Sequence, residues 1–157
     1  MNRNRPLRRS SRLLAVMAGA LVLLSAAPAL AAIKIQTAYF DPYRGPDPNT
    51  NAGRNKEYIV IRNTGSHAVS LTGWTLSDKA RPTTPSHVYK FPRFTLGGGK
   101  SVRVHTGKGR NNRTDLYWGS NVYVWGDDSD TATLKNGRGA KVDSCSWGTR
   151  DSSPKAC

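Results

Sequence analysis

Residues 57–78 read EYIVIRNTGSHAVSLTGWTLSD, and their pattern indicates the fold class. Its first part, EYIVIRN, is rich in β-branched and aromatic residues and predicts a strand over Glu57–Asn63, closed by the turn signal NTGS. Its second part, VSLTGWTLSD, predicts a pair of strands within Val69–Asp78, with a bend or bulge at Gly73. Short strands joined by turn residues are typical of an all-β protein.

Similar short apolar or alternating segments, separated by turn residues, recur along the rest of the chain. They predict strands at Ile33–Phe40, His87–Pro92, Lys100–Thr106, Val122–Trp125, Thr131–Asn136 and Ala140–Trp147. No segment shows a helical period, and the Pro- and Asn-rich residues 41–55 predict a long surface loop. We therefore expect an all-β sandwich or barrel.

The N-terminal segment has the features of a signal peptide. Arginines precede the uncharged apolar run Leu13–Leu24, and Ala29-Leu30-Ala31 matches an A-x-A cleavage signal. As a helix the apolar run would rise about 18 Å, which is short of the roughly 30 Å of a bilayer core. We therefore expect residues 1–31 to be a signal peptide cleaved after Ala31, and residues 32–157 to form one secreted domain without a membrane span. Ordinary secretion is expected, with twin-arginine export through Arg8-Arg9 as the alternative.

The chain contains only two cysteines, Cys145 and Cys157. In an oxidising compartment we expect them to form a disulfide that joins the C-terminal tail to the last strand. Closing a loop of about 12 residues stabilises a folded chain by roughly 3 kcal/mol in loop-entropy models. A free thiol or an intermolecular bridge is the alternative.

Positive charge is concentrated in the middle of the mature chain. Without the five arginines of the signal peptide, 19 basic residues face 10 acidic ones, a net charge of +9. Nine of the basic residues, and no acidic residue, lie between Asp78 and Asp115, so this segment holds the whole excess. Seven of them are candidate contacts to a polyanion: Lys90, Arg93, Lys100, Arg103, Lys108, Arg110 and Arg113.

Strand alternation predicts how some of these basic side chains point. In KSVRVHT the valines share one face, so Arg103 and His105 share the other. In HVYKFP the aromatic residues face the core, which places Lys90 outward. If the two strands belong to one sheet, Lys90 and Arg103 lie on one face beside the basic loop 108–110. Such a surface attracts phosphate groups by charge, without reading sequence. A solvated basic surface without a partner is the alternative.

Three blocks of the chain, EYIVIRNTGSHAVSLTGWTLSD, FPRFTLGGGKSVRVHTGKG and VYVWGDDSDTATLKNGRGAKVDSCSWG, carry a family pattern. The first is the most specific, because a strand with a tyrosine ends in Asn-Thr-Gly and is followed by Gly73-Trp74-x-Leu76-x-Asp78. These blocks resemble the lamin tail domain, which is found in nuclear lamins and in many secreted bacterial proteins. The resemblance covers about Ile33–Gly148 and implies an immunoglobulin-like β-sandwich without catalytic residues. It departs at Val60, where the family often has an acid.

Motifs of catalysis are weak in this sequence. Gly99-Lys100-Ser101 lacks the earlier glycine and the following helix of a Walker A loop, so we expect Gly97–Gly99 to form a turn. No G-x-S-x-G elbow is present. His87 and His105 are the candidate acid–base residues of an alternative function, a small secreted hydrolase or nuclease. We expect instead that both are solvated histidines at strand ends.

Acidic and aromatic residues predict no further site. The carboxylates of Asp127–Asp130 do not match an EF-hand, so an Asp-rich turn without metal is expected. Trp74 and Trp125 are expected to be buried within strands. Tyr117-Trp118 is the aromatic pair considered for surface contact.

Together these observations predict a secreted, non-enzymatic, immunoglobulin-like β-sandwich that acts as a binding or structural module without a cofactor. We expect its ligand to be nucleic acid or a polyanion of the cell envelope, bound weakly through the basic surface.

Overall fold

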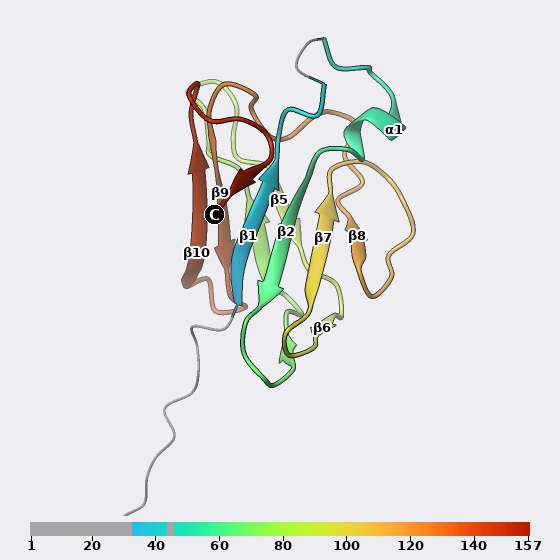
Figure 1. The fold of residues 1–157 in the computed structure, drawn as a ribbon, viewed down its shortest axis with the longest axis vertical. Coiled ribbons are helices and arrows are strands. Elements are labelled where there is room, and N and C mark those ends of the chain that lie inside the picture. The colour runs from blue at the N-terminus through green and yellow to red at the C-terminus, as the bar shows by residue number, and fades with distance from the viewer. Residues whose placement is uncertain (1–32, 44–45) are drawn as a thin grey trace, which may run out of the picture.

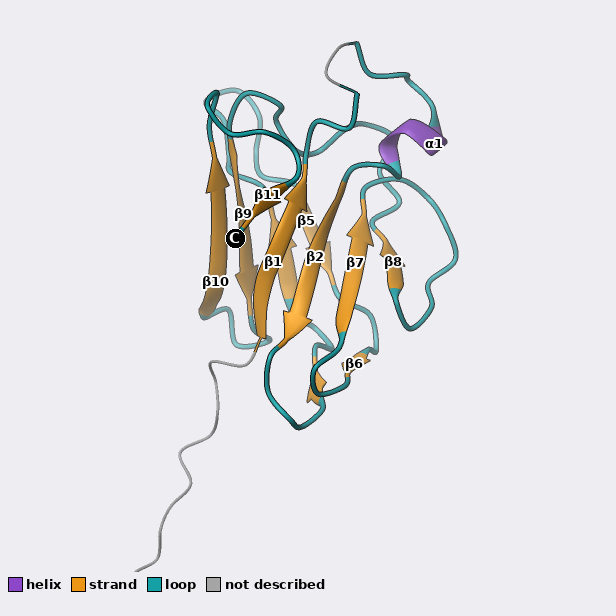
Figure 2. Ribbon diagram, viewed as in Figure 1, coloured by secondary structure: helices purple, strands orange, loops and turns teal. Residues whose placement is uncertain are grey.

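Nearly every regular segment of the chain is a β-strand (Figure 2). The computed structural model describes residues 33–43 and 46–157, so the expected signal peptide and its cleavage site lie outside the described residues. The strands are β1 (Ile33–Tyr39), β2 (Tyr58–Asn63), β3 (Val69–Ser70), β4 (Thr75–Ser77), β5 (Val88–Lys90), β6 (Thr95–Leu96), β7 (Ser101–His105), β8 (Asp115–Tyr117), β9 (Asp130–Lys135), β10 (Lys141–Trp147) and β11 (Lys155–Ala156), and the helix is α1 (Asn51–Arg54). Within residues 33–43 and 46–157, no helix has the length and apolar character needed to cross a membrane.

Two large sheets form the two layers of an immunoglobulin-like sandwich (Figure 1). The five-stranded sheet has the order β11-β1-β2-β7-β8, and the four-stranded sheet has the order β10-β9-β4-β5. β3 and β6 pair as a small separate ribbon. All pairings are antiparallel except that of β7 with β8, which is parallel. The all-β sandwich predicted from the strand pattern is confirmed.

The core lies between the two sheets, and alternation along the strands fills it. Ile59 and Ile61 of β2 are fully buried, whereas Arg62 is exposed. The same alternation buries Tyr89 beside the exposed Lys90, as predicted. Each fully buried aliphatic side chain stabilises the fold by about 1.5–3 kcal/mol, so the burial pattern fixes which face of each strand is inward.

Aromatic rings form a connected series at one end of this core. Trp125 contacts Trp118 at 5.8 Å and Trp147 at 5.9 Å between ring centroids, and both contacts are edge-to-face. Phe40 stacks on Trp147 at 4.6 Å. Trp74, expected to be buried within a strand, is half-buried immediately before β4.

The predicted strand at Val122–Trp125 is wrong, because this segment forms no ladder. The backbone N–H groups of Val124 and Trp125 donate instead to the carboxylate of Glu57. The predicted loop 41–55 is wrong at residues 51–54, which form α1, capped by the Thr50 hydroxyl that accepts from the Gly53 N–H at 3.0 Å. A single turn of helix is too short to show a helical period.

The disulfide between Cys145 and Cys157 is formed, with 5.5 Å between the Cα atoms. It joins β10 to the segment that follows β11, which pairs with β1. The Cys157 N–H also donates to the Gln36 carbonyl at 3.0 Å. The expected disulfide to the last long strand is confirmed, and the tail is in addition bonded to β1 of the other sheet.

Gly97–Gly99 forms the predicted turn, which packs against the turn after β2. Gly99 has φ of +68°, a conformation that favours glycine. Its N–H donates to the Gly65 carbonyl at 2.9 Å. A Cβ on Gly98 would lie only 2.2 Å from the Ser66 carbonyl oxygen. The close contact between the two turns therefore depends on glycine at position 98.

Gly98→Ala is expected to lower the free energy of unfolding by about 1–3 kcal/mol, because backbone atoms must shift to admit the methyl group. Gly97→Ala is the matched control, since a Cβ there meets only the flexible side chain of Lys100, at 3.3 Å. Urea denaturation of both variants measures the difference. Equal midpoints for the two variants would contradict the close contact of the turns.

Candidate functional site

The candidate basic residues lie on different parts of the molecule. β5 pairs with β4 in one sheet, and β7 pairs with β2 and β8 in the other. Lys90 and Arg103 therefore belong to opposite layers, so the condition for a shared face, that both strands lie in one sheet, is not met. Alternation along a strand determines whether a side chain points outward, but not which sheet the strand joins. Lys100 precedes β7, at the opposite end of that strand from the loop that follows it.

The loop 106–114 connects β7 to β8 and carries three of the candidates: Lys108, Arg110 and Arg113. Figure 1 shows this loop extending beyond β8 at the edge of the five-stranded sheet. Asparagines of the α1 region hold its start: the amides of Asn51 and Asn55 both donate to the Lys108 carbonyl at 2.9 Å. The Lys108 N–H donates back to the Asn51 side chain at 2.7 Å. The backbone at the start of the loop is thereby positioned.

Asparagine side chains in the rest of the loop form hydrogen bonds with the backbone of β8. The side chain of Asn111 accepts from the Tyr117 N–H at 2.9 Å, and that of Asn112 accepts from the Asp115 N–H at 2.9 Å. Gly109 lies directly against the ring of Tyr117, where a Cβ would come within 2.3 Å of a ring carbon. We did not predict from the sequence that Asn111 and Asn112 position this loop, although asparagine side chains commonly bond nearby backbone groups in turns.

Arg93 and Arg113 come together although they are distant in sequence. Both line one surface groove, together with Phe94, Asn112 and Leu116. We name the set Arg93, Lys108, Arg110 and Arg113 the basic edge; all four are exposed. Among the described residues, no carboxylate forms an ion pair with any of the four. Their charges are therefore uncompensated by a direct partner.

Arg103, in contrast, is paired, since its Nε lies 2.8 Å from Asp115. Burial acts to raise the pKa of Asp115, but hydrogen bonds from Thr114 and His105 and the charge of Arg103 outweigh it and lower that pKa. Asp115 therefore stays ionised and neutralises part of this face of the sheet.

His105 is buried, so the expectation of a solvated histidine is wrong. Its Nδ1 lies 2.7 Å from the Asn55 carbonyl, and its Nε2 lies 2.9 Å from Asp115. With both nitrogens bonded, the ring has no free nitrogen to act as a general base. His105 instead belongs to a row of rings across four strands: the centroid distances are 4.2 Å for Tyr39–Tyr58, 5.1 Å for Tyr58–His105 and 5.0 Å for His105–Tyr117.

The Tyr117-Trp118 pair is not a free aromatic surface. Tyr117 stacks on His105, and Trp118 packs against the core, with its ring 5.6 Å from that of Tyr89. Alternation explains the result, because neighbouring residues of β8 and its continuation point to opposite sides and each side is covered.

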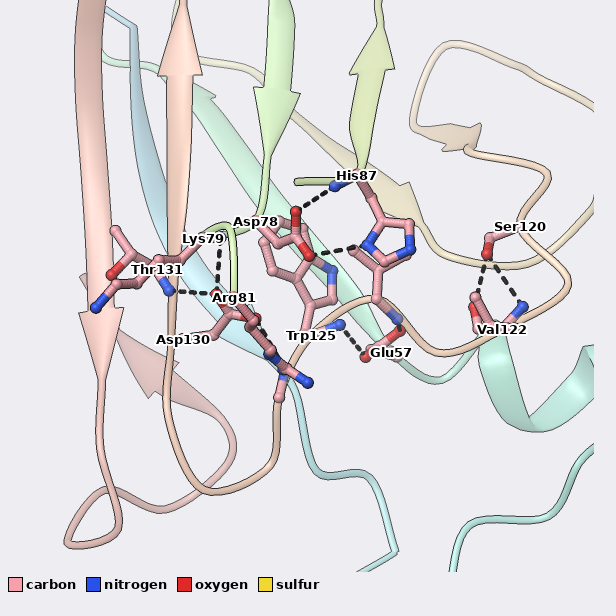
Figure 3. A network of polar contacts seen from close by, with 12 residues as sticks. Glu57, Asp78, Lys79, Arg81, His87, Ser120, Val122, Trp125, Asp130 and Thr131 are labelled. Carbon is pink, nitrogen blue, oxygen red and sulfur yellow. Dashed lines mark hydrogen bonds and ion pairs between the residues drawn. The ribbon is translucent and has the colours of Figure 1, made fainter. Parts of the chain in front are cut away.

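A second polar region lies where the loops meet at the end of the sandwich (Figure 3). Glu57 is completely buried and accepts from the Trp125 N–H at 2.8 Å and the Val124 N–H at 3.2 Å. Burial raises the pKa of Glu57 to about 8, although these two N–H groups favour the carboxylate. Hydrogen bonds to Glu57 thus position residues 124–125, which do not form the predicted strand. The place of Glu57 at the start of a strand did not suggest this role.

Neighbouring loops are held by two further buried carboxylates. Asp78 accepts from the His87 N–H and lies 2.9 Å from Nδ1 of the same residue. Asp130 accepts from the N–H groups of Lys79, at 2.9 Å, and Gly126, at 3.0 Å. His87 is therefore bonded at its ring to Asp78, and its side chain is 36% exposed, so the expected solvation is only partial.

The carboxylates of the acidic segment 127–130 differ in burial and do not gather at one point. Asp130 is buried among backbone donors, whereas Asp127 and Asp128 are exposed. In the part of the chain that the structure describes, no three histidine, cysteine, aspartate or glutamate side chains are grouped to hold a metal ion.

Comparison with known proteins places this architecture in a family. Residues 27–149, most of the chain, match the family model described as LTD, Lamin Tail Domain. None of the curated proteins matches the chain. The matched span contains β1 to β10, including the three blocks whose resemblance pointed to this family. The chain therefore belongs to the lamin tail domain family.

Proposed function

We propose that the protein is an exported, non-enzymatic binding module whose basic edge binds nucleic acid or another polyanion of the cell envelope. Membership of the lamin tail domain family supports a module that is generally non-catalytic. Export is supported by the signal-peptide features of residues 1–31 and by the disulfide, which forms in oxidising compartments.

The observation that carries the proposal is the convergence of Arg93 and Arg113 on one groove. Lys108 and Arg110 are exposed on the same loop as Arg113, and the backbone of this loop is held by asparagine side chains. A positioned backbone lowers the entropy that the loop loses when a ligand binds. Guanidinium groups suit phosphate and carboxylate, because they can donate two parallel hydrogen bonds.

Binding through this surface is expected to be weak, sequence-independent and sensitive to salt. Each neutralised phosphate releases condensed counterions, so the affinity falls with a log–log slope of about −0.9 per contact on duplex DNA. Four contacts correspond to a loss of roughly 100-fold between about 50 and 200 mM salt.

Fluorescence anisotropy with a labelled DNA duplex tests this prediction. Replacing Arg93, Lys108, Arg110 and Arg113 together with glutamine is expected to weaken binding at least about tenfold and to flatten the salt dependence. The control replaces Lys34, Lys135, Arg138 and Lys141 with glutamine. This set removes the same charge from exposed positions at the start of β1 and around the β9–β10 turn, so binding is expected to weaken only a few-fold.

Two outcomes would refute the basic edge as the binding site. One is the absence of any complex at low salt. The other is an equal loss of affinity in both variants, which would mean that only the net charge of the protein matters. A parallel titration with a carboxylate polymer distinguishes phosphate from general polyanion binding.

A further inference from the structure

A cavity of about 250 Å³ opens at the loop end of the sandwich, apart from the basic edge. Three segments that are distant in sequence form its walls: Asp47, residues 78–87, and Tyr123–Asp127. Figure 3 shows part of this wall, where the indole of Trp125 lies near the Asp78–His87 pair and Arg81. The cavity is large enough for one small polar molecule.

Two polar atoms of the lining are buried and have no hydrogen-bond partner among residues 33–43 and 46–157: Nε1 of Trp125 and Oδ1 of Asp47. Trp125 as a whole is only 3% exposed. A buried polar atom without a partner costs about 1–3 kcal/mol, and such atoms are rare in folded proteins. The lining therefore offers one unmet donor, an indole N–H, and one unmet acceptor, a carboxylate oxygen.

The charged groups of the lining leave a negative excess. Asp78 pairs with His87, and Arg81 pairs with Asp130, at 3.6 Å, which lies outside the lining. In the part of the chain that the structure describes, neither Asp47 nor Asp127 forms an ion pair. Burial and then the charges of neighbouring carboxylates raise the pKa of both groups, that of Asp127 to about 6, although the charge of Arg81 also acts on Asp127 and works to lower its pKa. Lys79 also lines the cavity, but the structure shows no ion pair for its ammonium among the described residues.

We propose that this cavity binds a small primary amine that carries an oxygen acceptor next to its ammonium group. The ammonium lies between the carboxylates of Asp47 and Asp127, and the ring of Tyr123 adds a cation–π contact. The adjacent oxygen accepts from the Trp125 indole N–H, which satisfies the second orphaned atom. An amino sugar and the amino terminus of a peptide both have this chemistry.

The two carboxylates select for the positive charge, and the indole N–H selects for the oxygen beside it. A neutral analogue leaves both carboxylates without a cation, and an aliphatic amine leaves the buried N–H unmet. Sites that hydrogen-bond a ligand group discriminate strongly against analogues that lack it, because their own buried groups are then unpaired. The site is independent of the polyanion-binding surface, since no residue of the basic edge lines the cavity.

Isothermal titration calorimetry at constant ionic strength tests the proposal with three probes: glucosamine, glycinamide and N-acetylglucosamine. Binding of either amine supports it, and the two amines distinguish the sugar from the peptide source. N-acetylglucosamine, which lacks the ammonium group, is expected to bind at least about tenfold more weakly than glucosamine.

Variants assign the binding to the cavity. Asp47→Asn is expected to weaken amine binding about tenfold, because it removes the negative charge and keeps the side chain's shape. Trp125→Phe is expected to weaken binding about fivefold, because it removes the indole N–H donor. Asp128→Asn is the matched control, since it removes the same charge from an exposed neighbour outside the lining, and it is expected to change the affinity less than about twofold.

Failure of both amines to bind at millimolar concentration overturns the proposal, as does equal binding of N-acetylglucosamine and glucosamine. Equal effects of Asp47→Asn and Asp128→Asn overturn it too, because they indicate long-range charge alone. If Trp125→Phe does not fold, Asp47→Asn decides the outcome, since Asp47 lies outside the core.

Discussion

Glu57→Ala is expected to lower the free energy of unfolding by about 3–5 kcal/mol, among the largest effects of any single substitution in this protein. The change leaves the N–H groups of Val124 and Trp125 buried without an acceptor, and each such group costs about 1–3 kcal/mol. It also leaves an empty volume beneath the loop end of the sandwich. Urea denaturation followed by tryptophan fluorescence measures the loss. A loss below about 1 kcal/mol would show that water replaces the carboxylate.

Glu57→Gln is the matched control and carries a pH test. The folded state raises the pKa of Glu57 from 4.5 to about 8, so between these values it holds a proton that the unfolded chain releases. The contribution of this group to stability is therefore fully present below about pH 4.5 and is lost as the pH rises through about 8. Glutamine cannot ionise, so the stability of Glu57→Gln should fall less steeply over this window, by up to about 1.4 kcal/mol per pH unit. Parallel profiles for the two proteins would contradict the raised pKa.

Replacing both Cys145 and Cys157 with serine is expected to lower the free energy of unfolding by about 3 kcal/mol, since the unfolded chain regains the entropy of an open loop. The loss has a local component, because β11 pairs with β1 through only two residue pairs and depends on the disulfide to stay in place. Amide hydrogen exchange is therefore expected to accelerate most at positions 156 and 157.

Reductant provides the control for the disulfide. The wild-type protein in reductant should match the double serine variant, and the variant itself should not respond to reductant. A wild-type protein whose denaturation midpoint is unchanged by full reduction would show that the sheets hold the tail without the covalent bond.

Most of the fold was predicted from the alternation of apolar and polar residues along the strands. β1, β2, β7, β9 and β10 were predicted within a residue or two of their bounds, because each has an apolar face that must be buried. β8 was missed, since its three residues are too few for a period and its parallel pairing with β7 depends on a loop that folds back along the sheet.

The wrong strand prediction at Val122–Trp125 arose because a local sequence pattern does not show hydrogen bonds to residues that are distant in the sequence. The segment has the residue types of a strand, yet its N–H groups are satisfied by a side chain 67 and 68 positions away in the sequence. A similar limit applies to the candidate sites. The sequence identified the basic segment, but the meeting of Arg93 with Arg113 and of Asp47 with Trp125 follows from loop packing between distant segments.

The aromatic series at the loop end also provides an intrinsic spectroscopic probe of the structure. Trp118, Trp125 and Trp147 contact one another through Trp125, with interplanar angles of 82° and 61°. Indoles this close and fixed in angle couple electronically, so the near-ultraviolet circular dichroism of the protein depends on their relative orientation. Trp125 lies at the centre of the coupled rings, beside both Glu57 and the cavity. A ligand or substitution that turns this one ring is therefore visible in the spectrum without any added label.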